Sequence, residues 1–128
     1  MRAMSIQVKL DEGLRQVFIT VLRAPHPTKV SEAVLRLTAQ RPELGGWDWI
    51  IDTRNPFEQA TPKELDQIAA AFNAARSKQS YTIFISHDVA GTSERCGLLD
   101  LKFLNRRHLV AKNLTEAKHL IPGTMRSI

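Results

Sequence analysis

WDWIIDTRNPFEQATPKE, residues 47–64, is the stretch of sequence that decides the fold. It opens with a short apolar run at residues 49–51, which is closed by Asp52. An apolar run without polar alternation is typical of a strand that is buried on both faces of a sheet. The polar residues 52–60 that follow predict a loop at the end of that strand.

The end of the same stretch carries the signals of a helix start. Thr61 can accept a hydrogen bond as the N-cap, and Pro62 suits the first helical position. Glu64 stands three residues after Thr61, which is the spacing of a capping box. The stretch therefore predicts one βα unit in the middle of the chain, made of a buried strand, a loop and a capped helix.

The length and composition indicate one ordinary globular domain over residues 1–128. Its 43% hydrophobic residues can form a core, and its 24% charged residues can cover the surface. The chain contains no apolar run long enough for a transmembrane helix, so none is expected. The first residues lack the apolar middle of a signal peptide. The single cysteine, Cys96, excludes an internal disulfide. We therefore expect a cytoplasmic protein with residues 1–4 and 124–128 frayed.

The formal net charge of +5 permits binding to nucleic acid or to an acidic partner. The cationic residues are scattered, however, and only residues 106–108, Arg-Arg-His, form a tight run. Scattered charge is typical of a solvated basic surface, so a nucleic-acid partner is not expected.

Hydrophobic patterns predict two strands followed by alternating helices and strands. Residues 5–10 alternate strictly between apolar and polar side chains, which is typical of a strand with one solvated face. A turn at residues 11–13 predicts that the second strand returns beside the first as a hairpin. The further expected elements are a central strand at 16–22, a helix at 28–40, the strand at 47–52, a helix at 62–76, a strand at 81–86, a loop at 87–93, a helix at 94–107, a strand at 109–111 and a helix at 113–121.

This order, ββαβαβαβα, predicts an α/β fold with a five-stranded mixed sheet and helices packed on it. Strands that are joined through helices run parallel, with right-handed crossovers. Only the first strand, which is joined by a short turn, is expected to run antiparallel, at one edge of the sheet.

The order of the elements, the size of the chain and its polar loops resemble the STAS domain superfamily, and in particular its SpoIIAA-like branch. That branch is related to anti-sigma-factor antagonists and to STAS-SEC14-like proteins. The resemblance extends over residues 6–121. It rests on the apolar strand that ends at Asp52, on the loop that leads into a helix at Thr61, and on the closing segment Asn-Leu-Thr-Glu-Ala at residues 113–117.

The resemblance implies a non-enzymatic regulatory module that binds a protein partner. Its working surface would be the 52–62 loop with the start of the second helix. In anti-sigma-factor antagonists a serine near this helix start is phosphorylated, within a segment of the Asp-Ser-Ser-Gly type. Residues 55–61 depart from that pattern because they contain no serine, so Thr61 is the only candidate phosphoacceptor at the helix start. The wider group also resembles the Sec14-type lipid-binding fold.

Polar residues follow the expected parallel strands, at the edge of the sheet where ligand sites form in α/β proteins. A histidine, carboxylates and an arginine can together hold a small anion or transfer protons. Aspartate at strand ends also serves as a turn or cap residue, so a structural role is the alternative. The candidate interaction or ligand residues are His26, Asp52, Thr53, Arg54, His87 and Asp88.

No catalytic or metal-binding motif is readable in the chain. Ser86, His87 and Asp88 carry the letters of a hydrolase triad, but consecutive side chains of an extended segment point to opposite faces. The histidines lack metal-ligand spacing, and no glycine-rich phosphate or dinucleotide loop is present. Cys96 lies near the expected helix start, where a thiolate is favoured, although a buried thiol is the alternative. We therefore expect no enzyme activity, no metal and no cofactor.

Trp47 and Trp49 lie two residues apart and face the same way on a strand. They can pack in the core, or they can form an aromatic patch for a partner. Such a patch, together with apolar strands that the expected helices are too few to cover, predicts a homodimer.

Three functional hypotheses follow. The first is the STAS-like protein-interaction module. The second is a binding domain for a small apolar molecule or lipid, with its site at the carboxyl ends of the strands or between sheet and helices. The third is an enzyme that uses His26, Asp52 and His87. An apolar cavity would favour the second hypothesis, converging polar side chains the third, and a flat surface the first.

Overall fold

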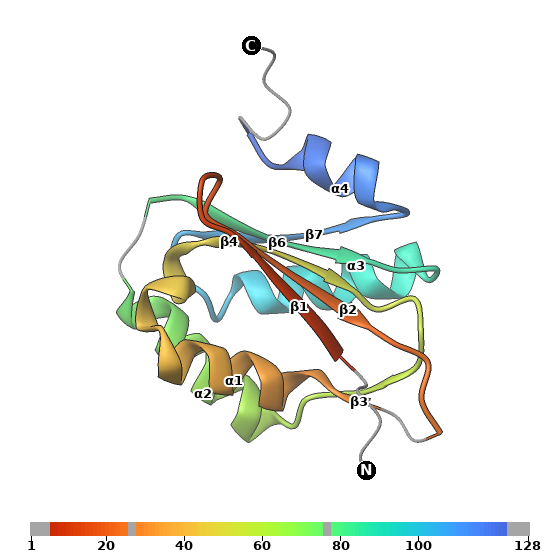
Figure 1. The fold of residues 1–128 in the computed structure, drawn as a ribbon, viewed down its shortest axis with the longest axis horizontal. Coiled ribbons are helices and arrows are strands. Elements are labelled where there is room, and N and C mark those ends of the chain that lie inside the picture. Colours follow the sequence, from red (N-terminus) through yellow and green to blue (C-terminus); the bar gives the residue numbers. More distant parts are fainter. Residues whose placement is uncertain (1–5, 26–27, 76–77, 123–128) are drawn as a thin grey trace.

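The chain folds around a five-stranded sheet with the strand order β1-β2-β4-β6-β7 (Figure 1). The computed structural model describes residues 6–25, 28–75 and 78–122, so the ends that are expected to fray lie outside the described residues. The first strand pair is antiparallel and the other pairs are parallel, which confirms the expected mixed sheet. The strands are β1 (Ile6–Asp11), β2 (Gln16–Val21), β4 (Asp48–Asp52), β6 (Ser80–Ile85) and β7 (Arg106–Ala111).

The helices divide unequally between the two faces of the sheet (Figure 1). The first three lie on one face, and the last lies on the other. In the described ranges no helix is long and apolar enough to cross a membrane. The helices are α1 (Val30–Gln40), α2 (Pro62–Ala74), α3 (Val89–Asp100) and α4 (Leu114–Leu120), with a short 3-10 helix, η1 (Pro42–Gly46), before β4.

β4 is buried on both faces, as its apolar run predicts. Successive side chains of a strand point to opposite faces. Trp49 and Ile51 therefore enter the larger core, which also contains Phe72 of α2. Ile50 enters the smaller core, which also contains Ala117 of α4.

A second, very short sheet was not expected. β3 (Thr28–Lys29) and β5 (Phe57–Glu58) pair in parallel, apart from the main sheet. This pairing ties the loop after β4 to the residues that precede α1. Strands of two residues are too short to show an alternating pattern, which is why the sequence does not reveal them.

α3 occupies a different range from the helix expected at 94–107. It runs from Val89 to Asp100, so the expected loop at 87–93 is wrong from Val89 onward. Asp88 is the N-cap of this helix, because its Oδ1 accepts a hydrogen bond from the Gly91 N–H at 3.1 Å. Gly91 and Gly97 are poor helix formers, and they hide the helical pattern in the sequence.

β7 begins at Arg106 rather than at residue 109. Arg106 and His108 are only 5% and 4% exposed, while Arg107 between them is exposed. Buried polar side chains at alternate positions disguise the apolar alternation that marks a half-buried strand.

Candidate functional site

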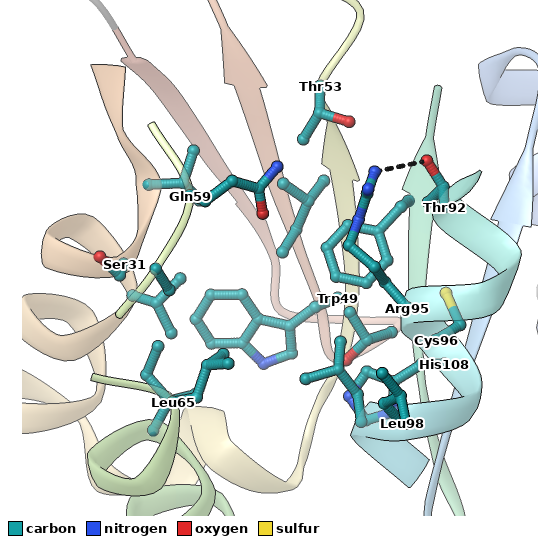
Figure 2. A pocket seen from close by; sticks show the side chains of 18 of the residues that line it. Ser31, Trp49, Thr53, Gln59, Leu65, Thr92, Arg95, Cys96, Leu98 and His108 are labelled. Atoms are coloured by element: carbon teal, nitrogen blue, oxygen red, sulfur yellow. Dashed lines mark hydrogen bonds between the residues drawn. The ribbon is translucent and has the colours of Figure 1, made fainter. Parts of the chain in front are cut away.

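A cavity of about 450 Å³ lies between the sheet and the helices of the larger core (Figure 2). α1 and α2 pack against each other on one side of it, and α3 packs against β7 on the other. Side chains from α1, α2, α3 and the intervening strands line the space. Residues far apart in the sequence therefore share one site.

β4 and β6 supply the floor of the cavity. Because alternate residues of a strand share a face, Trp49 and Ile51 of β4 and Thr82 and Phe84 of β6 all face the space. Trp49 is fully buried, and its Nε1 donates a hydrogen bond to the Leu44 carbonyl at 2.8 Å. The polar group of Trp49 is thus satisfied away from any ligand, and its ring adds apolar surface to the cavity.

One end of the cavity is closed where α2 meets the turn after α3. Phe103 in this turn lies edge-on to Phe72 of α2, with 5.6 Å between ring centroids. Asn73 of α2 donates to the Lys102 carbonyl at 3.2 Å and accepts from the Leu104 N–H at 2.8 Å. These contacts fasten the two segments together. The remaining apolar walls include Val30, Val34, Leu65, Ile68, Leu98 and Leu99.

The other end, which we call the mouth, lies at the carboxyl ends of β4 and β6 and is lined by Thr53, Ser86, Thr92 and Arg95 (Figure 2). The Thr53 hydroxyl donates to the Ile85 carbonyl at 3.0 Å. The Thr92 hydroxyl donates to Ser86 Oγ at 2.9 Å, and Arg95 Nη2 donates to Thr92 Oγ1 at 3.3 Å. Arg95 is exposed, so the cavity meets solvent here.

His108 and Cys96 are titratable side chains in the lining. Burial lowers the pKa of His108, and the hydrogen bond between its Nδ1 and Asp100 Oδ1, at 2.9 Å, offsets this effect only in part. Burial raises the pKa of the Cys96 thiol to about 11, so it stays protonated near neutral pH. Of the two alternatives for Cys96, a reactive thiolate or a buried thiol, the structure therefore shows the buried thiol. The part of the lining formed by His108 and Cys96 is uncharged at neutral pH.

Arg106 places a guanidinium inside the protein, with its Cζ 4.8 Å from the ring centre of Phe72. Burial lowers the pKa of Arg106 to about 10, which still leaves the group charged at neutral pH. The guanidinium ties β7 to η1, to the residue that precedes β4 and to β6, so its role is structural. Its hydrogen bonds run to the carbonyls of Gly45 (3.0 Å), Trp47 (2.6 Å) and Tyr81 (2.9 Å) and to Thr82 Oγ1 (3.0 Å).

Asp52 and Arg54, two of the predicted ligand residues, bind each other. Arg54 Nη2 lies 2.6 Å from Asp52 Oδ2, and Arg54 Nε lies 3.0 Å from Asp52 Oδ1. Burial acts to raise the pKa of Asp52, but the hydrogen bonds from Arg54 outweigh it, so the pKa is lowered. Thr53 lines the cavity, whereas Asp52 and Arg54 do not.

The predicted histidine and carboxylate candidates do not form the cavity. Asp88 is outside the lining, and its carboxylate caps α3 by accepting a hydrogen bond from the Gly91 N–H. Asp88 therefore has the structural role that was the alternative to ligand binding. His87 is exposed and also outside the lining. His26 lies outside the described residues.

The capping box at the start of α2 is confirmed. Thr61 Oγ1 accepts from the Glu64 N–H at 3.2 Å, and Glu64 Oε1 accepts from the Thr61 N–H at 2.9 Å. Lys29 Nζ lies 3.2 Å from the other carboxylate oxygen of Glu64. Phosphorylation of Thr61 stays a prediction.

Trp47 and Trp49 are both buried, at 8% and 0% exposure. Trp47 packs under Arg41, whose Cζ lies 5.3 Å from the ring centre. Neither tryptophan offers an aromatic patch to a partner at the surface. Trp49 instead contributes to the cavity.

Sequence reasoning missed the contribution of α3 to the site. Thr92, Arg95 and Leu99 lie on one face of α3 because they stand three and four residues apart. The sequence shows this helical spacing only if Asp88 is recognised as the N-cap of a helix that begins at Val89. The expected loop at 87–93 concealed it.

Within the described ranges, no group of three or more His, Cys, Asp or Glu side chains could hold a metal ion. No protein-family model, curated protein or solved structure matches the chain. The cavity is therefore the strongest guide to function.

Proposed function

We propose that this protein binds a small apolar molecule in the cavity between its sheet and α1, α2 and α3. The observation that carries the proposal is the volume of about 450 Å³ with a mainly apolar lining. Ligand sites commonly measure roughly 300–1,000 Å³ and combine apolar walls with a few polar groups. A ligand in this space gains about 25 cal/mol for each Å² of apolar surface that leaves water.

Binding without catalysis fits the side chains of this site. The Cys96 thiol, with a pKa of about 11, is not activated as a nucleophile. In the described part of the chain, the Ser86 hydroxyl bonds to Thr92 and to the backbone of Asp88 rather than to a histidine. We place this binding function in a non-enzymatic cytoplasmic protein.

Isothermal titration calorimetry with decan-1-ol tests the proposal. Leu65 lines the cavity from α2, so Leu65→Trp occupies part of the space and is expected to weaken binding roughly tenfold or more. Ala70→Trp adds the same side chain at an exposed position of α2 outside the lining, and should bind as the wild type does. A wild type that does not bind, or a Leu65→Trp variant with unchanged affinity, would contradict the proposal.

A STAS-like protein-interaction module that forms a homodimer is the second candidate. Three exposed leucines at the end of α3 and in the following turn favour it: Leu98, Leu101 and Leu104, at 64%, 84% and 73% exposure. Exposed apolar side chains that lie together tend to mark interfaces. Light scattering is expected to report a dimer that Leu101→Ser with Leu104→Ser converts to a monomer. A wild type that stays monomeric at high concentration would refute this candidate.

A further inference from the structure

The two ends of the cavity differ in chemistry (Figure 2). Trp49 and Leu65 belong to its apolar part, while Thr53, Thr92 and Arg95 gather at the mouth. A ligand that satisfies both parts has an apolar chain and a polar head. The charge at the mouth decides which head is favoured.

Arg95 is the cation at the mouth. Figure 2 shows its side chain running from α3 along the cavity toward Thr92. One of its N–H groups donates to Thr92 Oγ1 at 3.3 Å, and Thr92 is held in turn by Ser86 at 2.9 Å. Among the described residues no carboxylate forms an ion pair with Arg95. A guanidinium carries several N–H donors, so those that remain can bind an anion.

Lys102, another basic side chain of the lining, already has an ion-pair partner. Lys102 Nζ lies 2.8 Å from Asp66 Oδ1. Glu58 is the only carboxylate among the described lining residues, and its register partner in the short sheet is Lys29. Lys29 forms its ion pair with Glu64, at 3.2 Å, and Glu58 adds only a smaller electrostatic effect on it. Arg95 is thus the cation of the described lining that has no ion-pair partner.

We infer that the ligand is a single-chain amphiphile whose terminal oxyanion, a carboxylate or a phosphate monoester, binds Arg95 while its alkyl chain fills the cavity. The inference rests on the proposed function, because it names the ligand class of the same site. A planar guanidinium makes paired N–H···O bonds with either oxyanion. The chain of the ligand then points away from the mouth, toward Trp49.

Calorimetric titration of the full chain with decanoate, decyl phosphate and decan-1-ol tests the inference, because the three probes share one alkyl chain and differ in the head. The wild type is expected to bind at least one anion roughly tenfold more tightly than the alcohol, as charge-assisted hydrogen bonds predict. Tighter binding of decanoate indicates a fatty acid, and tighter binding of decyl phosphate indicates a lipid phosphate. Arg95→Met should remove this preference, so that the three probes bind with similar affinity.

Arg36→Met is the matched control, since Arg36 is an exposed arginine of α1 outside the lining. It should bind all three probes as the wild type does, and circular dichroism should show that both variants are folded. If the wild type prefers neither anion, or if Arg95→Met weakens all three probes equally, the inference is overturned while the proposed function stands. If the wild type binds none of the probes, the proposed function fails and the inference fails with it.

Discussion

At Arg106 a charged side chain is held in the interior mainly by backbone carbonyls. Arg106→Met leaves several buried acceptors without a donor, and each such loss costs about 1–3 kcal/mol. We expect the free energy of unfolding to fall by at least about 3 kcal/mol, measured by urea denaturation. Arg107→Met is the adjacent control: Arg107 is exposed and approaches Asp100 only at 4.0 Å, so its loss should cost less than about 0.5 kcal/mol. Equal losses in both variants would contradict the structural role of Arg106.

His108 gives the stability of the protein a dependence on pH. Burial lowers its pKa in the folded state, and Asp100 and Arg106 are the charged groups that act on it. As pH falls below the ordinary histidine pKa of about 6.5, the unfolded chain binds a proton more readily than the folded chain. The free energy of unfolding should therefore fall with pH in this range, by up to about 1.4 kcal/mol per pH unit. His108→Phe should have a shallower slope in urea denaturation at several pH values, and an unchanged slope would rule out His108 as its source.

Among the elements, α3 contains two glycines with opposite structural settings. A Cβ at residue 91 would collide with the Asp88 carboxylate that caps the helix, whereas a Cβ at residue 97 would meet open space. Gly97→Ala should raise the free energy of unfolding by about 0.5–1 kcal/mol, because alanine favours the helix. Gly91→Ala should lower it by about 1 kcal/mol through loss of the cap. Thermal denaturation that shifts both variants in the same direction would disagree with this description.

The capping box of α2 makes a separate prediction at the same scale. Thr61→Ala removes the acceptor for the Glu64 N–H and is expected to cost about 1 kcal/mol of stability. Thr61→Ser keeps a hydroxyl at the N-cap and should retain nearly all of it. Urea denaturation of the two variants measures the difference. A Thr61→Ser protein as unstable as Thr61→Ala would show that the hydroxyl is not the source of the stability.

The helices and strands that could be predicted from the sequence are those whose local sequence pattern matches the burial of their side chains in the structure. The apolar run of β4 and the capping residues of α2 are visible within a few positions of the chain. The start of β7 was missed because Arg106 and His108 are buried by virtue of partners elsewhere in the chain. In each missed case a tertiary contact outweighs the local signal.

At the scale of the whole molecule, the cavity could not be predicted from local patterns. It is the space left between α2 and α3, and residues as distant in sequence as Trp49, Leu65 and Arg95 line it. Of the predicted ligand candidates, Trp49 and Thr53 lie in this lining. Asp52 and Asp88 instead accept hydrogen bonds from residues nearby in the sequence, Arg54 and Gly91. From the sequence alone, this structural role could not be distinguished from ligand binding.

Binding of an apolar ligand in the cavity is tested most directly by the indole N–H signals of isotope-labelled protein in an NMR titration with decan-1-ol. The chain has two tryptophans, of which Trp49 lines the cavity and Trp47 does not, and Trp49→Phe assigns the signals. Saturable binding is expected to shift the Trp49 signal and leave that of Trp47 in place. If neither signal moves, or if both move equally, the ligand does not occupy this cavity and the central claim is contradicted.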